Sequence, residues 1–72
     1  MSYTLLLRIC SMLYGSCMAP ISDGKDYSDF SACALEGTRA SNELILFLSP
    51  EEINKNQLYI QFTCMKKPDI KL

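Results

Sequence analysis

The clearest alternation of hydrophobic and polar residues in this chain lies at residues 58–64, LYIQFTC. One set of alternate positions holds Leu58, Ile60, Phe62 and Cys64, and the other set holds Tyr59, Gln61 and Thr63. A period of two is that of a half-buried strand, and the residue types are ones that favour strands. The pattern therefore predicts a β-strand over 58–64.

A continuous apolar run, ELILFL, occupies residues 43–48. Its length favours a buried strand over a helix. The next residues, SPEE, have the signature of a helix start, with Ser49 as the N-cap and Pro50 in the first turn. We expect only a short helical turn at about 50–56, because two asparagines follow closely. A connection this short does not suit a parallel crossover, so the strands at 43–48 and 58–64 are expected to pair antiparallel.

The middle of the chain is more polar and is expected to contain loops. Residues 22–31 and 36–42 carry glycines among charged and hydroxyl side chains, which indicates turns, and the short stretch 31–35 is expected to start a strand. The fold class predicted from these patterns is a small β-rich domain, with a mixed α+β fold as the alternative.

The N-terminal segment has the features of a secretory leader. It contains one charged residue, Arg8, followed by an uncharged stretch and by Ala19, a small residue suited to cleavage. We therefore predict that residues 1–19 are a candidate signal peptide or apolar N-terminal segment and that 20–72 form a single small domain. The alternative is that this segment stays in place and completes the core. It is too short and too interrupted for a transmembrane helix, so no stable membrane span is expected.

Four cysteines are present, and removal of the leader would leave Cys33 and Cys64, a candidate disulfide. A bridge of this span contributes roughly 3–4 kcal/mol in the chain-entropy model. In a simple meander these two residues would lie on outer strands, about 9.6 Å apart, beyond the ~7 Å reach of a disulfide. The bridge thus requires that the segment with Cys33 lie beside the last strand or in a second layer. If the leader stays, the pairing of four cysteines is open.

Composition excludes several classes of function. The chain has 72 residues, a net charge of −1 and no histidine. No basic patch is available for a nucleic-acid backbone, and the commonest general base and metal ligand is missing. Asp23, Asp26 and Asp29 do not have the spacing of a calcium loop, so we interpret them as a solvated acidic loop. No catalytic residue, metal ligand or cofactor is predicted.

By exclusion, the sequence predicts a small, non-enzymatic, secreted interaction protein, such as a ligand, effector or toxin-like module. The candidate contact residues are Tyr59, Gln61 and Thr63, on the exposed face of the predicted strand, with Tyr59 as an anchor. An edge strand here could also pair with a strand of a protein partner. The alternative is a cytoplasmic structural subunit, or a truncated product, that folds against a larger partner.

Overall fold

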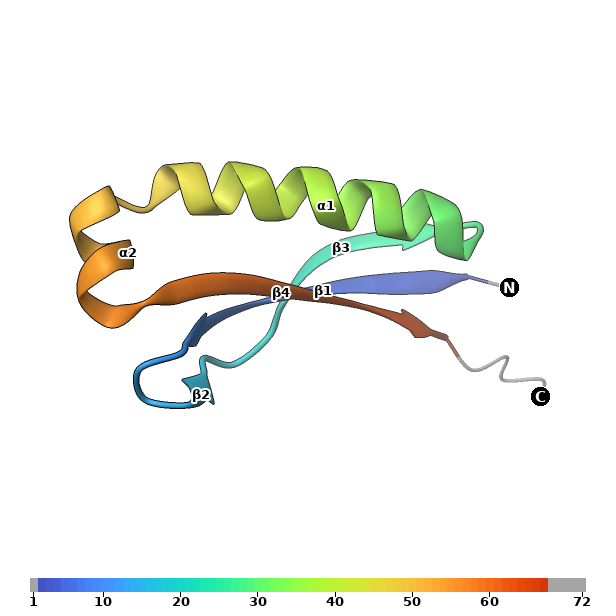
Figure 1. Ribbon diagram of the computed structural model, residues 1–72. Helices are drawn as coiled ribbons and strands as arrows, with labels where there is room; N and C mark the ends of the chain where they lie inside the picture. Colours follow the sequence, from blue (N-terminus) through green and yellow to red (C-terminus); the bar gives the residue numbers. More distant parts are fainter. Residues whose placement is uncertain (1, 68–72) are drawn as a thin grey trace.

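A four-stranded antiparallel sheet carries one long helix on one of its faces (Figure 1). The computed structural model describes residues 2–67. The elements in chain order are β1 (Tyr3–Ser11), β2 (Ser16–Cys17), β3 (Ile21–Tyr27), α1 (Phe30–Phe47), α2 (Pro50–Asn56) and β4 (Leu58–Lys66). The fold is therefore small, rich in β structure and of the α+β type, as the sequence predicts.

The centre of the sheet is β1. On one side it pairs with β4 along its whole length, from Tyr3 opposite Lys66 to Ser11 opposite Leu58. On the other side it pairs with β3 in its first half and with the short β2 at its end. The candidate leader, 1–19, thus contains the strand that joins all the others, and β4 lies at one edge of the sheet.

The face of the sheet under α1 is apolar. Alternation along β1 places Leu5, Leu7 and Ile9 on this face, next to the apolar residues of β4. The fully buried hydrophobic residues among 2–67 are few, namely Leu5, Cys10 and Cys33. The core is therefore a thin layer between α1 and the sheet, with Cys10 on the opposite face.

The predicted strand at 43–48 is wrong, because residues 43–47 form the last turns of α1 and Leu48 is its C-cap. The predicted loop at 36–42 and strand at 31–35 are also part of this helix. The helix begins where the Asp29 carboxylate accepts a hydrogen bond from the amide of Ala32, at 2.7 Å. Alanine, leucine, glutamate and arginine residues, which favour helices, recur along 32–46 and carry the helix through the polar stretch into the apolar run. A short apolar run cannot by itself be assigned to a strand or a helix.

The predicted helical turn at 50–56 is confirmed as α2. The Ser49 hydroxyl accepts a hydrogen bond from the amide of Glu52 at 3.2 Å, and Pro50 occupies the first turn. The helix ends at Gln57, which has the left-handed φ of 50°. The predicted strand at 58–64 is confirmed as well, but it pairs with β1, because no strand is present at 43–48.

The polar stretch predicted as a loop at 22–31 is largely a strand, β3. Gly24 has a φ of 74°, and the pairing with β1 shifts register between Thr4 and Leu6. Such irregularity is typical of an edge strand. Almost every side chain of β3 is exposed, which explains why its sequence lacks the alternation of a half-buried strand.

Candidate functional site

Two disulfides fix the layers of the protein. The predicted pair, Cys33 and Cys64, is bridged, with 6.1 Å between the Cα atoms, and joins α1 to β4. Cys33 thus lies in a second layer, one of the two arrangements that the sequence allowed. A second bridge, Cys10–Cys17, joins β1 to β2. Sequence reasoning assigned that pair to the leader, although the short spacing around Gly15 would have suited a hairpin. Two disulfides in so small a chain fit an extracellular location.

The three aspartates of the acidic stretch have separate structural roles. Asp29 caps α1, and Asp26 forms an ion pair with Lys67, 2.6 Å between Oδ1 and Nζ. The Asp23 carboxylate accepts hydrogen bonds from the Tyr27 hydroxyl and, at 3.0 Å, from the Lys25 amide. Within residues 2–67, no cluster of three or more side chains is placed to hold a metal ion.

The hydrogen bond between Asp23 and Tyr27 shifts the pKa of both groups. Desolvation acts to raise the pKa of Asp23, but the bonds from Tyr27 and the Lys25 amide outweigh it and hold this pKa below its usual value. The same bond, followed by desolvation, raises the pKa of Tyr27 to about 12. Both groups lie on the surface, so this pair stabilises the edge strand locally.

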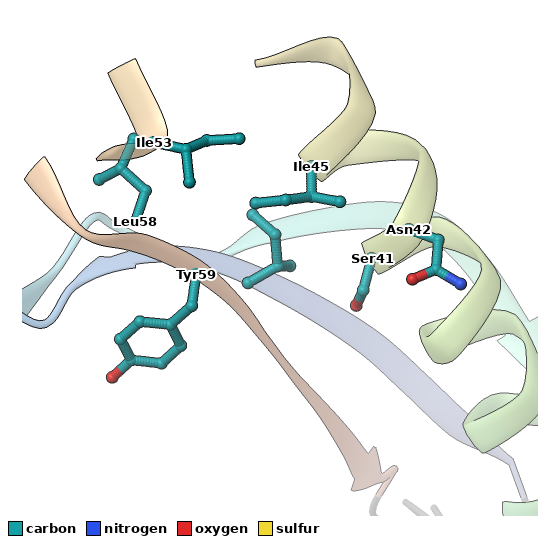
Figure 2. Close-up of a pocket in the computed structure, with 7 residues that line it drawn as sticks. Ser41, Asn42, Ile45, Ile53, Leu58 and Tyr59 are labelled. Atoms are coloured by element: carbon teal, nitrogen blue, oxygen red, sulfur yellow. The ribbon is translucent and has the colours of Figure 1, made fainter. Parts of the chain in front are cut away.

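An apolar cleft of about 290 Å³ lies between α1, α2 and β4 (Figure 2). Its apolar side chains come from all three elements: Ile45, Ile53, Leu58 and Ile60. Short polar residues of α1, Ser41 and Asn42, form its other end. The cleft arises because α1 ends at Phe47 and the chain turns through Leu48 and Ser49, so that Ile53 of α2 faces Ile45 across a gap.

Beside this cleft, every second residue of β4 has its backbone N–H and C=O groups directed away from β1, toward the free edge of the sheet. The Met12 amide donates to the Gln57 carbonyl and the Lys67 amide to the Ser2 carbonyl, both at 2.9 Å. Hydrogen-bonded pairs alternate along an antiparallel ladder, so the odd-numbered residues of β4 bond to β1. The amides and carbonyls of the even-numbered residues therefore face the free edge: Leu58, Ile60, Phe62, Cys64 and Lys66.

Of the predicted contact residues, Tyr59 borders this cleft, although its side chain belongs to the opposite face of β4, and Gln61 and Thr63 do not line the cleft. Tyr59, Gln61 and Thr63 alternate with the residues under α1, as the sequence predicts, and Figure 2 shows the Tyr59 ring pointing away from Ile45. The Gln61 side-chain oxygen lies 3.9 Å from Sγ of Cys10, on this open face. The sequence does not predict the cleft, because the pattern around Ile45, which lines it on α1, favours a strand.

A second apolar cleft, of about 380 Å³, lies on the other side of α1 and is lined by Leu7, Ile21, Ala40, Glu43, Leu44 and Phe47. In the part of the chain described, no helix is long and apolar enough to cross a membrane. No family model, curated protein or solved structure matches this chain.

Proposed function

We propose that this protein is a non-enzymatic interaction module that binds an extended segment of a partner protein at the free edge of β4. The observation that carries the proposal is the position of the cleft, directly beside unpaired backbone groups of Leu58 and Ile60. In strand addition, main-chain hydrogen bonds supply affinity, while pockets for alternate side chains supply specificity. This edge offers both features.

The geometry defines what the bound segment should look like. Residues of an added strand that lie opposite Leu58 and Ile60 point to the same face as these two side chains. They would enter the cleft and contact Ile45 and Ile53, so they should be apolar. The intervening residues would lie along the open face beside Tyr59, which gives that predicted anchor a role in the same interface.

A second copy of this chain is a poor occupant of the site. In the register that pairs two β4 strands along their whole length, Leu58 faces Lys66 and Ile60 faces Cys64 of the other copy. A lysine and a disulfide-bonded cysteine would then lie against the apolar cleft. A partner strand with branched apolar residues at these positions fits the cleft better, so we assign the edge to a different protein.

The two disulfides support a secreted protein, because such bridges persist in oxidising compartments. Cleavage of residues 1–19 during export stays a prediction. Since those residues include β1, removal at Ala19 would take away the strand between β3 and β4.

The test is selection of random linear peptides on the immobilised, oxidised full chain, followed by measurement of affinity for the selected sequences by fluorescence anisotropy. We expect sequences with alternating apolar residues. Ile45→Lys should weaken their binding at least tenfold, whereas Leu46→Lys should not, because Leu46 is exposed outside the cleft. Ile60→Pro should also abolish binding, because it removes an outward amide that makes no bond to β1.

Circular dichroism checks that each variant is folded. The proposal is wrong if no peptide is enriched, or if the selected peptides bind Ile45→Lys and Ile60→Pro as well as the unsubstituted chain. It is also wrong if the chain alone sediments as a dimer that Ile60→Pro dissociates, since a second copy would then occupy the edge.

A further inference from the structure

The loop between β1 and β2 exposes three large apolar side chains in a row. Met12 is 71% exposed, Leu13 53% and Tyr14 70%, and Met18, just after β2, is also exposed. Single exposed apolar residues are ordinary on protein surfaces, but a contiguous group is a mark of an interaction site. This group is separate from the cleft beside β4.

The loop is held in this conformation by covalent and hydrogen bonds. The Cys10–Cys17 disulfide closes its base, and the Gly15 amide donates to the Ser11 carbonyl at 2.9 Å. The Ser11 hydroxyl accepts from the Tyr14 amide at 3.2 Å and donates to the Asn56 carbonyl at 2.7 Å. The apolar side chains are thus presented to solvent by a fixed backbone, and binding through them needs little further ordering.

No charged side chain interrupts this part of the chain. Residues 9–22 contain no Asp, Glu, Lys or Arg, and the loop tip offers apolar side chains and one phenol. Protein interfaces usually centre on aromatic and arginine anchors with paired polar groups around them. A bilayer surface requires only apolar area, with tyrosine favoured at the level of the headgroups.

The loop also lies where it can approach a flat surface. It is at the opposite end of the sheet from Ser2 and Lys67, whose backbones are hydrogen-bonded at 2.9 Å (Figure 1). The first residues of β4 lie next to this loop, since the Met12 amide donates to the Gln57 carbonyl, but none of the loop's exposed apolar residues lines the cleft beside β4.

We propose that the disulfide-closed loop, residues 11–16, inserts its apolar side chains into the interfacial region of a lipid bilayer with zwitterionic headgroups. Anionic lipid is not required, because the loop carries no Lys or Arg to attract it. This contact is shallow and reversible, and it involves no membrane-spanning segment.

The experiment uses the oxidised full chain and phosphatidylcholine vesicles. The protein has no tryptophan, so Leu13→Trp supplies a single reporter, and Leu35→Trp, at a 73% exposed position of α1, is the matched control. We expect the emission of Leu13→Trp to shift to the blue with added vesicles and to be quenched by brominated lipid. The emission of Leu35→Trp should not change. In cosedimentation, Leu13→Asp should lower vesicle binding at least tenfold and Leu35→Asp less than twofold.

Four results would overturn the proposal. The first is a Leu13→Trp emission that stays unshifted at saturating lipid. The second is equal loss of vesicle binding in Leu13→Asp and Leu35→Asp. The third is binding that requires anionic lipid and is reversed by salt. If Leu13→Asp instead abolishes binding of the peptides selected on the β4 edge, the loop belongs to a protein interface and the lipid assignment is wrong.

Discussion

Gly37 of α1 lies directly against the ring of Phe62 in β4. A Cβ atom at residue 37 would lie 2.8 Å from Cγ of Phe62 and closer still to Cδ1 and Cε1. The glycine has no positive φ and is not needed for a turn. It permits close approach of the helix to the sheet, four residues after the cysteine that bridges the same two elements.

Gly37→Ala should therefore destabilise the protein, although alanine is the better helix former. Overpacking typically costs ~1–3 kcal/mol, and the helix propensity returns about 1 kcal/mol, so we expect a net loss of about 1 kcal/mol. Urea denaturation measures it, with Thr38→Ala on the exposed side as a control that should not destabilise. Gly37→Ala combined with Phe62→Leu should recover part of the loss. A single variant as stable as the unsubstituted chain would contradict this packing.

This glycine also shows why part of the fold was not accessible to sequence reasoning. The sequence around Gly37 indicates a turn, but the role of this glycine depends on Phe62, a residue far away in the sequence. By contrast, the signals for α2 and β4 are local: a capping serine with proline, and a strict alternation. These two elements, which have local signals, were predicted correctly, and the predicted bounds of β4 are close to the observed ones.

The site was only partly predictable for the same reason. The two faces of β4 follow from alternation, so Tyr59 and its neighbours were placed on the correct side. The cleft requires that Ile45 be helical, and a six-residue apolar run does not distinguish helix from strand. The central position of β1 depends on pairing with residues at the other end of the chain, which no local pattern reports.

The two disulfides should contribute unequally to stability. In the chain-entropy model, the Cys33–Cys64 bridge, which spans 31 residues, contributes about 4 kcal/mol, and Cys10–Cys17, which spans 7, about 2.5 kcal/mol. Denaturation of the two double-serine variants should show the larger loss for Cys33→Ser with Cys64→Ser. The opposite order would mean that closure of the hairpin matters more than the link between the layers.

A fragment of residues 20–72 should not fold cooperatively. It lacks Leu5 and Cys10, two of the buried residues, and it leaves β3 and β4 without their common neighbour. Circular dichroism with urea titration should show no sigmoidal transition for the oxidised fragment, next to a clear one for the full chain. A cooperative transition in the fragment would show that β1 is dispensable, as a cleaved leader requires. The intact mass of protein exported from a secreting host provides the independent check.

The hydrogen bond between Asp23 and Tyr27 delays ionisation of the Tyr27 phenol until the solution is strongly basic. Because the pKa of Tyr27 is raised from 10.0 to about 12, this bond contributes fully below pH 10 and is lost as the pH rises through 12. The Asp23 pKa is lowered, so on the acid side the contribution is present above 3.8 and is lost as the pH falls through the lowered value.

Ultraviolet absorbance titration can follow this tyrosine among the four in the chain. One phenol should ionise near pH 12, and Asp23→Ala should lower the pKa of this phenol toward 10. Asp26→Ala, which removes a carboxylate that pairs with Lys67, is the control and should leave the late ionisation unchanged. A titration curve that is the same with and without the Asp23 carboxylate would contradict the pairing.

The position of β1 has a consequence for how the chain is made. On the ribosome β1 emerges before the other described elements, yet its longest ladder is with β4, which follows all of them in the chain. Such distant pairing is slow to form, because a long loop must close before any contact is gained. The sheet can therefore be completed only after synthesis has passed Lys66. Until then the apolar residues of β1 can bind chaperones, and the cysteine thiols that have not yet formed their disulfides can be oxidised. Nascent chains stalled before β4 should accordingly be sensitive to protease, even though they already contain β1, β3 and α1.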